Sequence, residues 1–155
     1  MTQRKYIGDL LVEEGHINRD QLLYALNLKK KKYHYMKLGK ILLNLGYISD
    51  DTLIKLLARQ YGMQGVNIYN RAISKSVIDL ISRKTAEKYQ IIPLGFNTSG
   101  NNIKLVIATS NPSDLDKIEH ICFVTGQVID LVYARKEDID WAIKYYYKEG
   151  GVVIQ

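Results

Sequence analysis

A chain of 155 residues, with 46% hydrophobic and 25% charged residues, is long enough to bury a core as one ordinary domain or two small ones. Global disorder is excluded, and no apolar run approaches the ~18–20 residues that a membrane-spanning helix needs. The net charge of +6 is compatible with nucleic-acid or anionic-membrane binding. The sequence carries no zinc-finger, RNA-recognition or standard helix-turn-helix signature, so we expect no DNA or RNA partner.

The first residues do not form a signal peptide, and the single cysteine, Cys122, excludes an internal disulfide. Both features agree with a cytoplasmic location. The three histidines, His16, His34 and His120, have no metal-ligand spacing with one another or with Cys122. We therefore expect no metal site and no cofactor.

An internal repeat organises the first half of the chain. Gly8 and Gly39 lie 31 residues apart (39 − 8), and Gly15 and Gly46 have the same spacing (46 − 15). The first copy runs from Tyr6 to Lys29 and the second from Lys37 to Gln60. At the same offset, five further positions are identical: Leu11 and Leu42, Ile17 and Ile48, Asp20 and Asp51, Leu22 and Leu53, and Leu26 and Leu57.

Each copy predicts a short helix, a tight turn and a longer helix. Gly15 and Gly46 stand where a left-handed C-terminal cap ends the short helix. Asn18 begins the next helix of copy one, with Gln21 three residues later as in a capping box, and Ser49 caps the corresponding helix of copy two. The first half is thus expected to be a bundle of four short helices.

Four consecutive lysines, 29–32, concentrate much of the positive charge at the end of copy one. Cations favour the C-terminal end of a helix, which predicts a solvated helix end here. Phosphate contacts on a small ligand and an acidic protein partner stay open as alternatives.

The second half alternates short strands and helices after a loop-like connection over 63–75. Pro93 favours a strand edge or strand end, since proline cannot donate to a ladder. The stretch 111–114 (Asn-Pro-Ser-Asp) is better explained by a turn and a helix cap than by a polar site. The expected elements are a helix over 76–89, a strand over 91–94, a polar turn over 97–102, a strand over 103–108, a helix from Ser113 to about Gly126, a strand over 128–132 and a helix over 136–147.

These elements predict an α+β fold, in which a bundle of short helices from a tandem repeat precedes a small α/β subdomain of about three strands and three helices. The expected boundaries are a helical subdomain over 1–62, a linker over 63–75, the α/β subdomain over 76–148 and a tail over 149–155.

Catalytic motifs are absent from the sequence. No G-x-x-x-x-G-K-[ST] phosphate loop occurs, and no serine lies in a nucleophile elbow. We predict no catalytic residues, so the chain itself is not expected to be an enzyme.

The two copies share a specific order of glycines and aliphatic residues. Copy one reads Ile7-Gly8-x-x-Leu11-Val12-x-x-Gly15-x-Ile17, followed by Leu22, Leu26 and Lys29. Copy two reads Lys37-Leu38-Gly39-x-x-Leu42-Leu43-x-x-Gly46-x-Ile48, followed by Leu53, Leu57 and Gln60. This order resembles the tandem motif of the MshEN-type N-terminal domain of type II secretion and type IV pilus assembly (extension) ATPases. The segments 91–94 and 108–114 resemble the C-terminal part of the same family, so the resemblance covers almost the whole chain.

The sequence departs from the family motif at three positions. The family's initial arginine is Tyr6 in copy one and Lys37 in copy two. The family's final glutamine is Lys29 in copy one and is kept as Gln60 in copy two. Copy two is therefore the closer match.

The resemblance implies that the paired copies bind one cyclic di-GMP, a dianionic ring with approximate two-fold symmetry. Gly8 and Gly39 would let a phosphate approach backbone N–H groups. Lys37 keeps the charge of the lost arginine, whereas the Tyr6 ring would stack on guanine, which is worth roughly 1–3 kcal/mol. Lys29 would donate to guanine O6 or N7. The remaining predicted site residues are the retained Gln60 and the aliphatic residues Ile7, Leu22, Leu26, Leu38, Leu53 and Leu57.

Structural roles are the alternative for these residues: the leucines as core and Tyr6 as a cover over the bundle end. The family also implies a parent ATPase and a place at the cytoplasmic side of the inner membrane, reached through partners. A second function is therefore a docking module that joins the ATPase to its inner-membrane platform protein, with a degenerate nucleotide site. Residues 145–147, three tyrosines, would be its aromatic anchor or would pack the α/β core. A third alternative is a stand-alone response protein without a motor.

Overall fold

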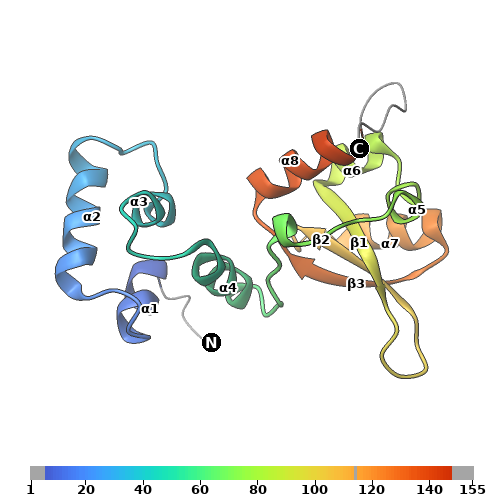
Figure 1. Ribbon diagram of the computed structural model, residues 1–155, viewed down its shortest axis with the longest axis horizontal. Helices are drawn as coiled ribbons and strands as arrows, with labels where there is room; N and C mark the ends of the chain where they lie inside the picture. The colour runs from blue at the N-terminus through green and yellow to red at the C-terminus, as the bar shows by residue number, and fades with distance from the viewer. Residues whose placement is uncertain (1–5, 114, 148–155) are drawn as a thin grey trace.

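The computed structural model describes residues 6–113 and 115–147, arranged as two lobes joined at helix α4 (Figure 1). The first lobe is the expected bundle of short helices. Its helices are α1 (Ile7–Glu13), α2 (Arg19–Lys31), α3 (Leu38–Asn44) and α4 (Asp50–Gln60).

Caps and turns of the first lobe follow the repeat. The Asn18 side chain accepts a hydrogen bond from the Gln21 backbone N–H, and the Gln21 side chain accepts one from the Asn18 backbone N–H. The two bonds confirm the capping box. Ser49 accepts from the Thr52 backbone N–H and so caps α4. Gly15 and Gly46 have φ of +78° and +76°, the left-handed geometry that glycine tolerates best. The buried core of this lobe comprises Leu11, Ile17, Leu22, Ala25, Ile41, Leu42, Ile48, Leu53 and Leu56.

The lysine run lies at the end of α2, in its last turn and cap. Three of the four side chains are exposed and the Lys29 side chain is half-buried. This confirms the prediction of a solvated helix end, where the cations complement the helix dipole.

The second lobe contains a three-stranded sheet in the order β1-β2-β3, so the fold class is α+β as expected. Strands β1 (Ile91–Asn97) and β2 (Lys104–Thr109) are antiparallel, and β3 (Val128–Tyr133) runs parallel to β2. Pro93 lies on the edge strand β1, as its missing N–H requires, and the register shifts between Pro93 and Gly95. The helices of this lobe are a 3₁₀ turn η1 (Ile68–Asn70), α5 (Lys75–Ile78), α6 (Arg83–Tyr89), α7 (Leu115–Thr125) and α8 (Lys136–Tyr146).

The helix predicted over 76–89 is wrong in one respect, because the structure divides it into α5 and α6. Ser82 accepts a hydrogen bond from the Thr85 backbone N–H, so it starts a new helix rather than continuing the old one. The second lobe thus has four α-helices among its described residues, where about three were expected.

The segment expected to be a linker, 63–75, is packed into the second lobe. Tyr133 donates its backbone N–H to the Gln64 carbonyl and accepts from the Val66 N–H, so the segment extends the sheet edge at β3. Val66, Ile68 and Ile73 are buried in the same core as the strands. Their irregular spacing hides this burial from a search for helical or strand periodicity. The tail expected over 149–155 lies outside the described residues.

Helix α4 contacts both lobes, each through a different set of its side chains. Leu53 and Leu56 pack in the helical core, whereas Ile54 and Ala58 pack against Tyr133 of β3. At its first turn, Asp50 accepts a hydrogen bond of 2.7 Å from Arg135 Nη1, at the start of α8. Within the described ranges, no helix has the length and apolar character to cross a membrane.

Candidate functional site

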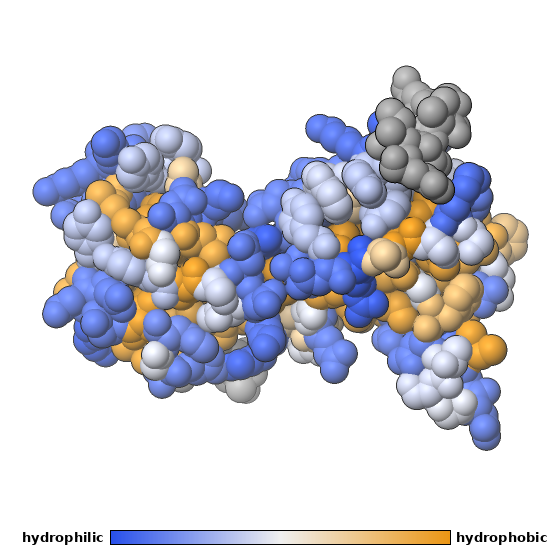
Figure 2. Space-filling view, viewed as in Figure 1, coloured by the Kyte–Doolittle hydropathy of each residue, from blue (hydrophilic) through white to orange (hydrophobic). Residues whose placement is uncertain are grey.

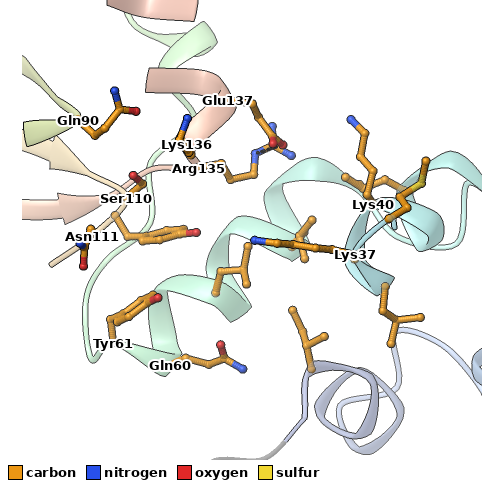
Figure 3. Close-up of a pocket in the computed structure, with 18 of the residues that line it drawn as sticks. Lys37, Lys40, Gln60, Tyr61, Gln90, Ser110, Asn111, Arg135, Lys136 and Glu137 are labelled. Carbon is orange, nitrogen blue, oxygen red and sulfur yellow. Dashed lines mark ion pairs between the residues drawn. The ribbon is translucent and has the colours of Figure 1, made fainter. Parts of the chain in front are cut away.

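A cavity of about 800 Å³ lies where the two lobes meet, a size within the range of ligand pockets. Figure 3 shows its walls: α3 and α4 on one side, and the start of α8 with the loops of the α/β lobe on the other. Figure 2 shows hydrophilic residues gathered along the junction of the lobes, with hydrophobic residues on both sides of it.

The helical wall is built mainly from copy two. All six site residues predicted in that copy line the cavity, and Ile7 joins them from copy one. In Figure 3 the Lys37 side chain extends from the start of α3 towards the α/β lobe. The predicted residues that line the cavity are Ile7, Lys37, Leu38, Gly39, Leu53, Leu57 and Gln60.

The remaining predicted residues of copy one do not line this cavity. Tyr6 is 83% exposed, and Leu22 is buried in the helical core. Lys29 donates its ammonium group to the Met36 carbonyl, which keeps it beside the α2–α3 connection. Gly8 and Leu26 are likewise absent from the lining. The cavity thus collects the site residues of copy two and Ile7 of copy one, although Gly8 of copy one also lies close to Leu38, with 3.2 Å between an added Cβ and Leu38 Cδ2.

Both repeat glycines have a packing role. A Cβ on Gly39 would stand 2.9 Å from Leu53 Cδ1, and one on Gly8 would stand 2.7 Å from Leu22 Cδ1. Each glycine therefore leaves space for the side chain of the leucine 14 residues later in its own copy (53 − 39 and 22 − 8). This contact lets the two helices of each copy pack closely together. This packing explains the glycines without a bound phosphate.

The α/β wall was missed by sequence reasoning, since its residues come from separate loops and helix ends with no shared motif. Tyr61, the residue after copy two, stacks on Tyr133 with ring centroids 5.5 Å apart. Burial, followed by the proximity of Tyr61, raises the pKa of Tyr133 to about 12, so its hydroxyl stays protonated at neutral pH. Tyr61 itself is the C-cap of α4, on the helical side. The α/β wall is formed by Lys88, Tyr89, Gln90, Ser110, Asn111, Lys117, Tyr133, Arg135, Lys136 and Glu137.

Two cations of this wall are buried and already bonded. Arg135, 8% exposed, donates to Asp138 at 2.8 and 3.2 Å and to Asp50 at 2.7 Å. Burial by itself lowers the pKa of Arg135, but hydrogen bonds to Asp138 and Asp50 raise it above its ordinary value. Lys117 donates to Thr109 Oγ1 at 2.6 Å and to the Asn111 carbonyl. The turn after β2 is therefore held by Lys117, which supports the turn predicted for that polar stretch. Helix α7 begins at Leu115 rather than directly after Ser113, and Asp114, the residue before it, lies outside the described residues.

The sequence matches the family model described as the MshEN domain over residues 50–153. That range begins at α4 and takes in the α/β half. Among curated relatives, the type IV pilus assembly ATPase PilB of Myxococcus xanthus is 31% identical over 145 residues, which is 94% of this chain and 25% of the relative. The PilB of Thermus thermophilus is 21% identical over 150 residues, 97% of this chain and 16% of the relative. The chain spans a quarter or less of these two relatives.

Solved structures show the same fold. A structure of MshE with cdg has a TM-score of 0.58 and 28% identity, covering 93% of this chain and all of the other. The N-terminal domain of XpsE has a TM-score of 0.51 and 22% identity, covering 95% of this chain and all of the other. The MshE structure is similar to this chain in sequence as well as in fold, whereas the XpsE structure shows the fold alone.

Proposed function

The chain belongs to the MshEN domain family, and we propose that it is a regulatory domain of a type IV pilus or type II secretion assembly ATPase that binds cyclic di-GMP. We take the cdg of the MshE structure to be this dinucleotide. The observation that carries the proposal is the convergence of all six copy-two residues on one cavity of about 800 Å³.

The chemistry of the helical wall suits a cyclic dinucleotide. Lys37 and Lys40, at the start of α3, offer two cations to phosphate oxygens. Leu53 and Leu57, one turn apart on α4, offer an apolar surface to a base or ribose. The Gln60 amide carries both donors and an acceptor, which the edge of guanine can use.

Hydrolysis of ATP is assigned in this proposal to the part of the parent protein that this chain does not span. The chain contains no Walker phosphate loop, so its own nucleotide site serves as a sensor. We place the domain on the cytoplasmic side of the inner membrane, where partners of the parent ATPase would hold it.

The test is calorimetry of the purified chain with cyclic di-GMP, with GTP and cyclic di-AMP as specificity controls. Lys37→Ala is expected to weaken binding roughly ten- to a hundredfold, because a charged hydrogen bond contributes about 1.5–3 kcal/mol. Gln60→Ala is expected to weaken it as well. Lys55→Ala is the matched control, since Lys55 is an exposed cation on α4 that does not line the cavity. The proposal is refuted if the unsubstituted 155-residue chain binds none of the three nucleotides.

A docking function is the second candidate, and an exposed aromatic cluster favours it. Trp141 stacks on Tyr145 at 5.0 Å and lies 4.4 Å from the Tyr69 ring, and Tyr145 is 50% exposed. Tyr146 and Tyr147 instead bond to backbone carbonyls of their own lobe, including that of Arg71, so they serve the core. If the chain is a docking module, Tyr145→Ala should abolish capture of the inner-membrane platform protein without changing cyclic di-GMP binding.

A further inference from the structure

We propose that the exposed side of helix α2, together with the α2–α3 connection, is a contact surface for an anionic lipid bilayer. This basic face consists of Leu23, Tyr24, Lys30 and Lys31 of α2 and Tyr35 of the connection. In Figure 1, α2 is the outermost helix of the first lobe, on the side away from the α/β lobe. None of these residues belongs to the predicted cyclic di-GMP site, so lipid binding and nucleotide binding can be measured separately.

The net charge of the whole chain originates in this part of the sequence. Between Asp20 and Asp50, residues 21–49 contain six lysines, at 29–32, 37 and 40, and no aspartate or glutamate. The rest of the chain has 16 basic residues (22 − 6) and all 16 acidic ones, so its formal charges cancel. The excess of +6 is thus concentrated where it attracts an anionic surface, over a Debye length of roughly 8–10 Å.

Helix α2 places two of these cations in line with exposed apolar side chains. Leu23 lies two turns before Lys30, and Tyr24 lies two turns before Lys31, so the four residues share one side of the helix. All four are exposed. Within residues 6–113 and 115–147, no hydrogen bond or ion pair engages the ammonium group of either lysine. The lysines can therefore bind lipid phosphates while the leucine and the tyrosine enter the headgroup region.

The internal repeat shows that the corresponding side of α4 is covered. At the offset of 31 residues, Leu23 corresponds to Ile54 and Asn27 to Ala58. Ile54 and Ala58 pack against Tyr133 of the α/β lobe. In copy one the same side carries no such cover in the described part of the chain, since Leu23 is 62% exposed. The basic face is thus a packing surface of the repeat that is left open to another partner.

A second copy of this chain does not suit the basic face. Lys30 and Lys31 correspond to Tyr61 and Gly62 of copy two (61 − 30 and 62 − 31). Tyr61 stacks on Tyr133 with ring centroids 5.5 Å apart, and a lysine offers no ring for this stack. The two lysines also repel another chain with a net charge of +6. The substitution of lysines at these positions favours an anionic partner.

The combination of lysine with exposed apolar residues favours a bilayer over an acidic protein. Lysine is depleted in protein–protein interfaces, and its strongly hydrated ammonium group is costly to bury there. At a bilayer surface the ammonium group stays hydrated among the phosphates, and tyrosine rings occupy the headgroup level. Tyr35, which is 76% exposed, supplies a second ring beside the lysine run. A lipid surface therefore uses both the charge and the exposed apolar area of the basic face.

The test is co-sedimentation of the full 155-residue chain with vesicles of phosphatidylglycerol and phosphatidylethanolamine, and with vesicles of phosphatidylcholine alone. The chain is expected to bind the anionic vesicles selectively at low ionic strength and to be released at about 1 M salt, where the Debye length is ~3 Å. The double variant Lys30→Ala/Lys31→Ala should lower the partition coefficient roughly tenfold or more. Leu23→Asn should weaken binding to the anionic vesicles several-fold, because it removes apolar area that enters the headgroup region.

The matched control is Lys84→Ala/Lys144→Ala, which removes two exposed cations from the α/β lobe and gives the same net charge. It should bind the vesicles like the unsubstituted chain, and circular dichroism melting checks that every variant is folded. The proposal is overturned if the unsubstituted chain ignores anionic vesicles, if it binds both compositions equally, or if the control loses as much binding as Lys30→Ala/Lys31→Ala. A chain that ignores vesicles would leave an acidic protein or a nucleic acid as the partner of the basic face. The proposed function is judged by nucleotide binding and fails or stands separately.

Discussion

Gly39 has a packing role that can be measured through its contact with Leu53. A Cβ there would stand 2.9 Å from Leu53 Cδ1 and 3.3 Å from Leu53 Cδ2, so Gly39→Ala forces a buried leucine to move. We expect a loss of about 1–3 kcal/mol of unfolding free energy from overpacking, reduced by the roughly 1 kcal/mol that alanine gains over glycine in a helix. Urea denaturation of Gly39→Ala, Leu53→Ala and the double variant measures the coupling. Equal costs of Gly39→Ala in both backgrounds, within about 0.5 kcal/mol, would contradict the packing role.

At the scale of elements, the start of α8 is fixed to α4 through Arg135. The Asp138 side chain is 2% exposed and that of Asp50 is 58% exposed, so the two partners of Arg135 differ in their surroundings. Asp138→Asn leaves a buried cation without its main counter-charge and should cost about 3 kcal/mol or more. Asp50→Asn removes a partly solvated partner and should cost about 1 kcal/mol or less. Chemical denaturation of both variants tests the order, and a larger loss for Asp50→Asn would show that the joint depends on the inter-lobe pair instead.

Some of these elements could be predicted from the sequence and others could not. Local signals predicted the repeat, its caps and the three strands, because helix caps and periodicity depend on residues a few positions apart. The division between α5 and α6 depends on Ser82, which competes as a cap against an apparently continuous helix. Val66 bonds to Tyr133 of β3, 67 residues later (133 − 66), and η1, which contains Ile68, packs against α8, so the burial of both depends on distant segments. The α/β wall of the cavity was missed for the same reason, since Lys88 and Lys136 are brought to it by tertiary packing alone.

For the whole molecule, the shared helix α4 predicts that the lobes unfold together. Ile54 and Ala58 of α4 pack against Tyr133, and Leu53 and Leu56 of the same helix pack in the helical core. Trp141 is the single tryptophan and lies in the α/β lobe, so its fluorescence reports that lobe, whereas far-ultraviolet circular dichroism reports the helices of both. In the parent chain the two probes should give coincident denaturation midpoints, as a two-state transition requires. Tyr133→Ala removes the ring between the lobes and should separate the midpoints.

Cyclic di-GMP should change both denaturation midpoints when it is bound. A ligand at about 100 times its dissociation constant adds about 2.7 kcal/mol to the stability of the state that binds it. Because the proposed cavity lies where the two lobes meet, a ligand in it should raise the fluorescence and the circular dichroism midpoints together, and it should bring the separated midpoints of Tyr133→Ala closer. A ligand held by the helical lobe alone would leave the Trp141 transition of Tyr133→Ala in place while the helical transition moved. That outcome would confine the site to the tandem repeat and remove the α/β lobe from ligand recognition.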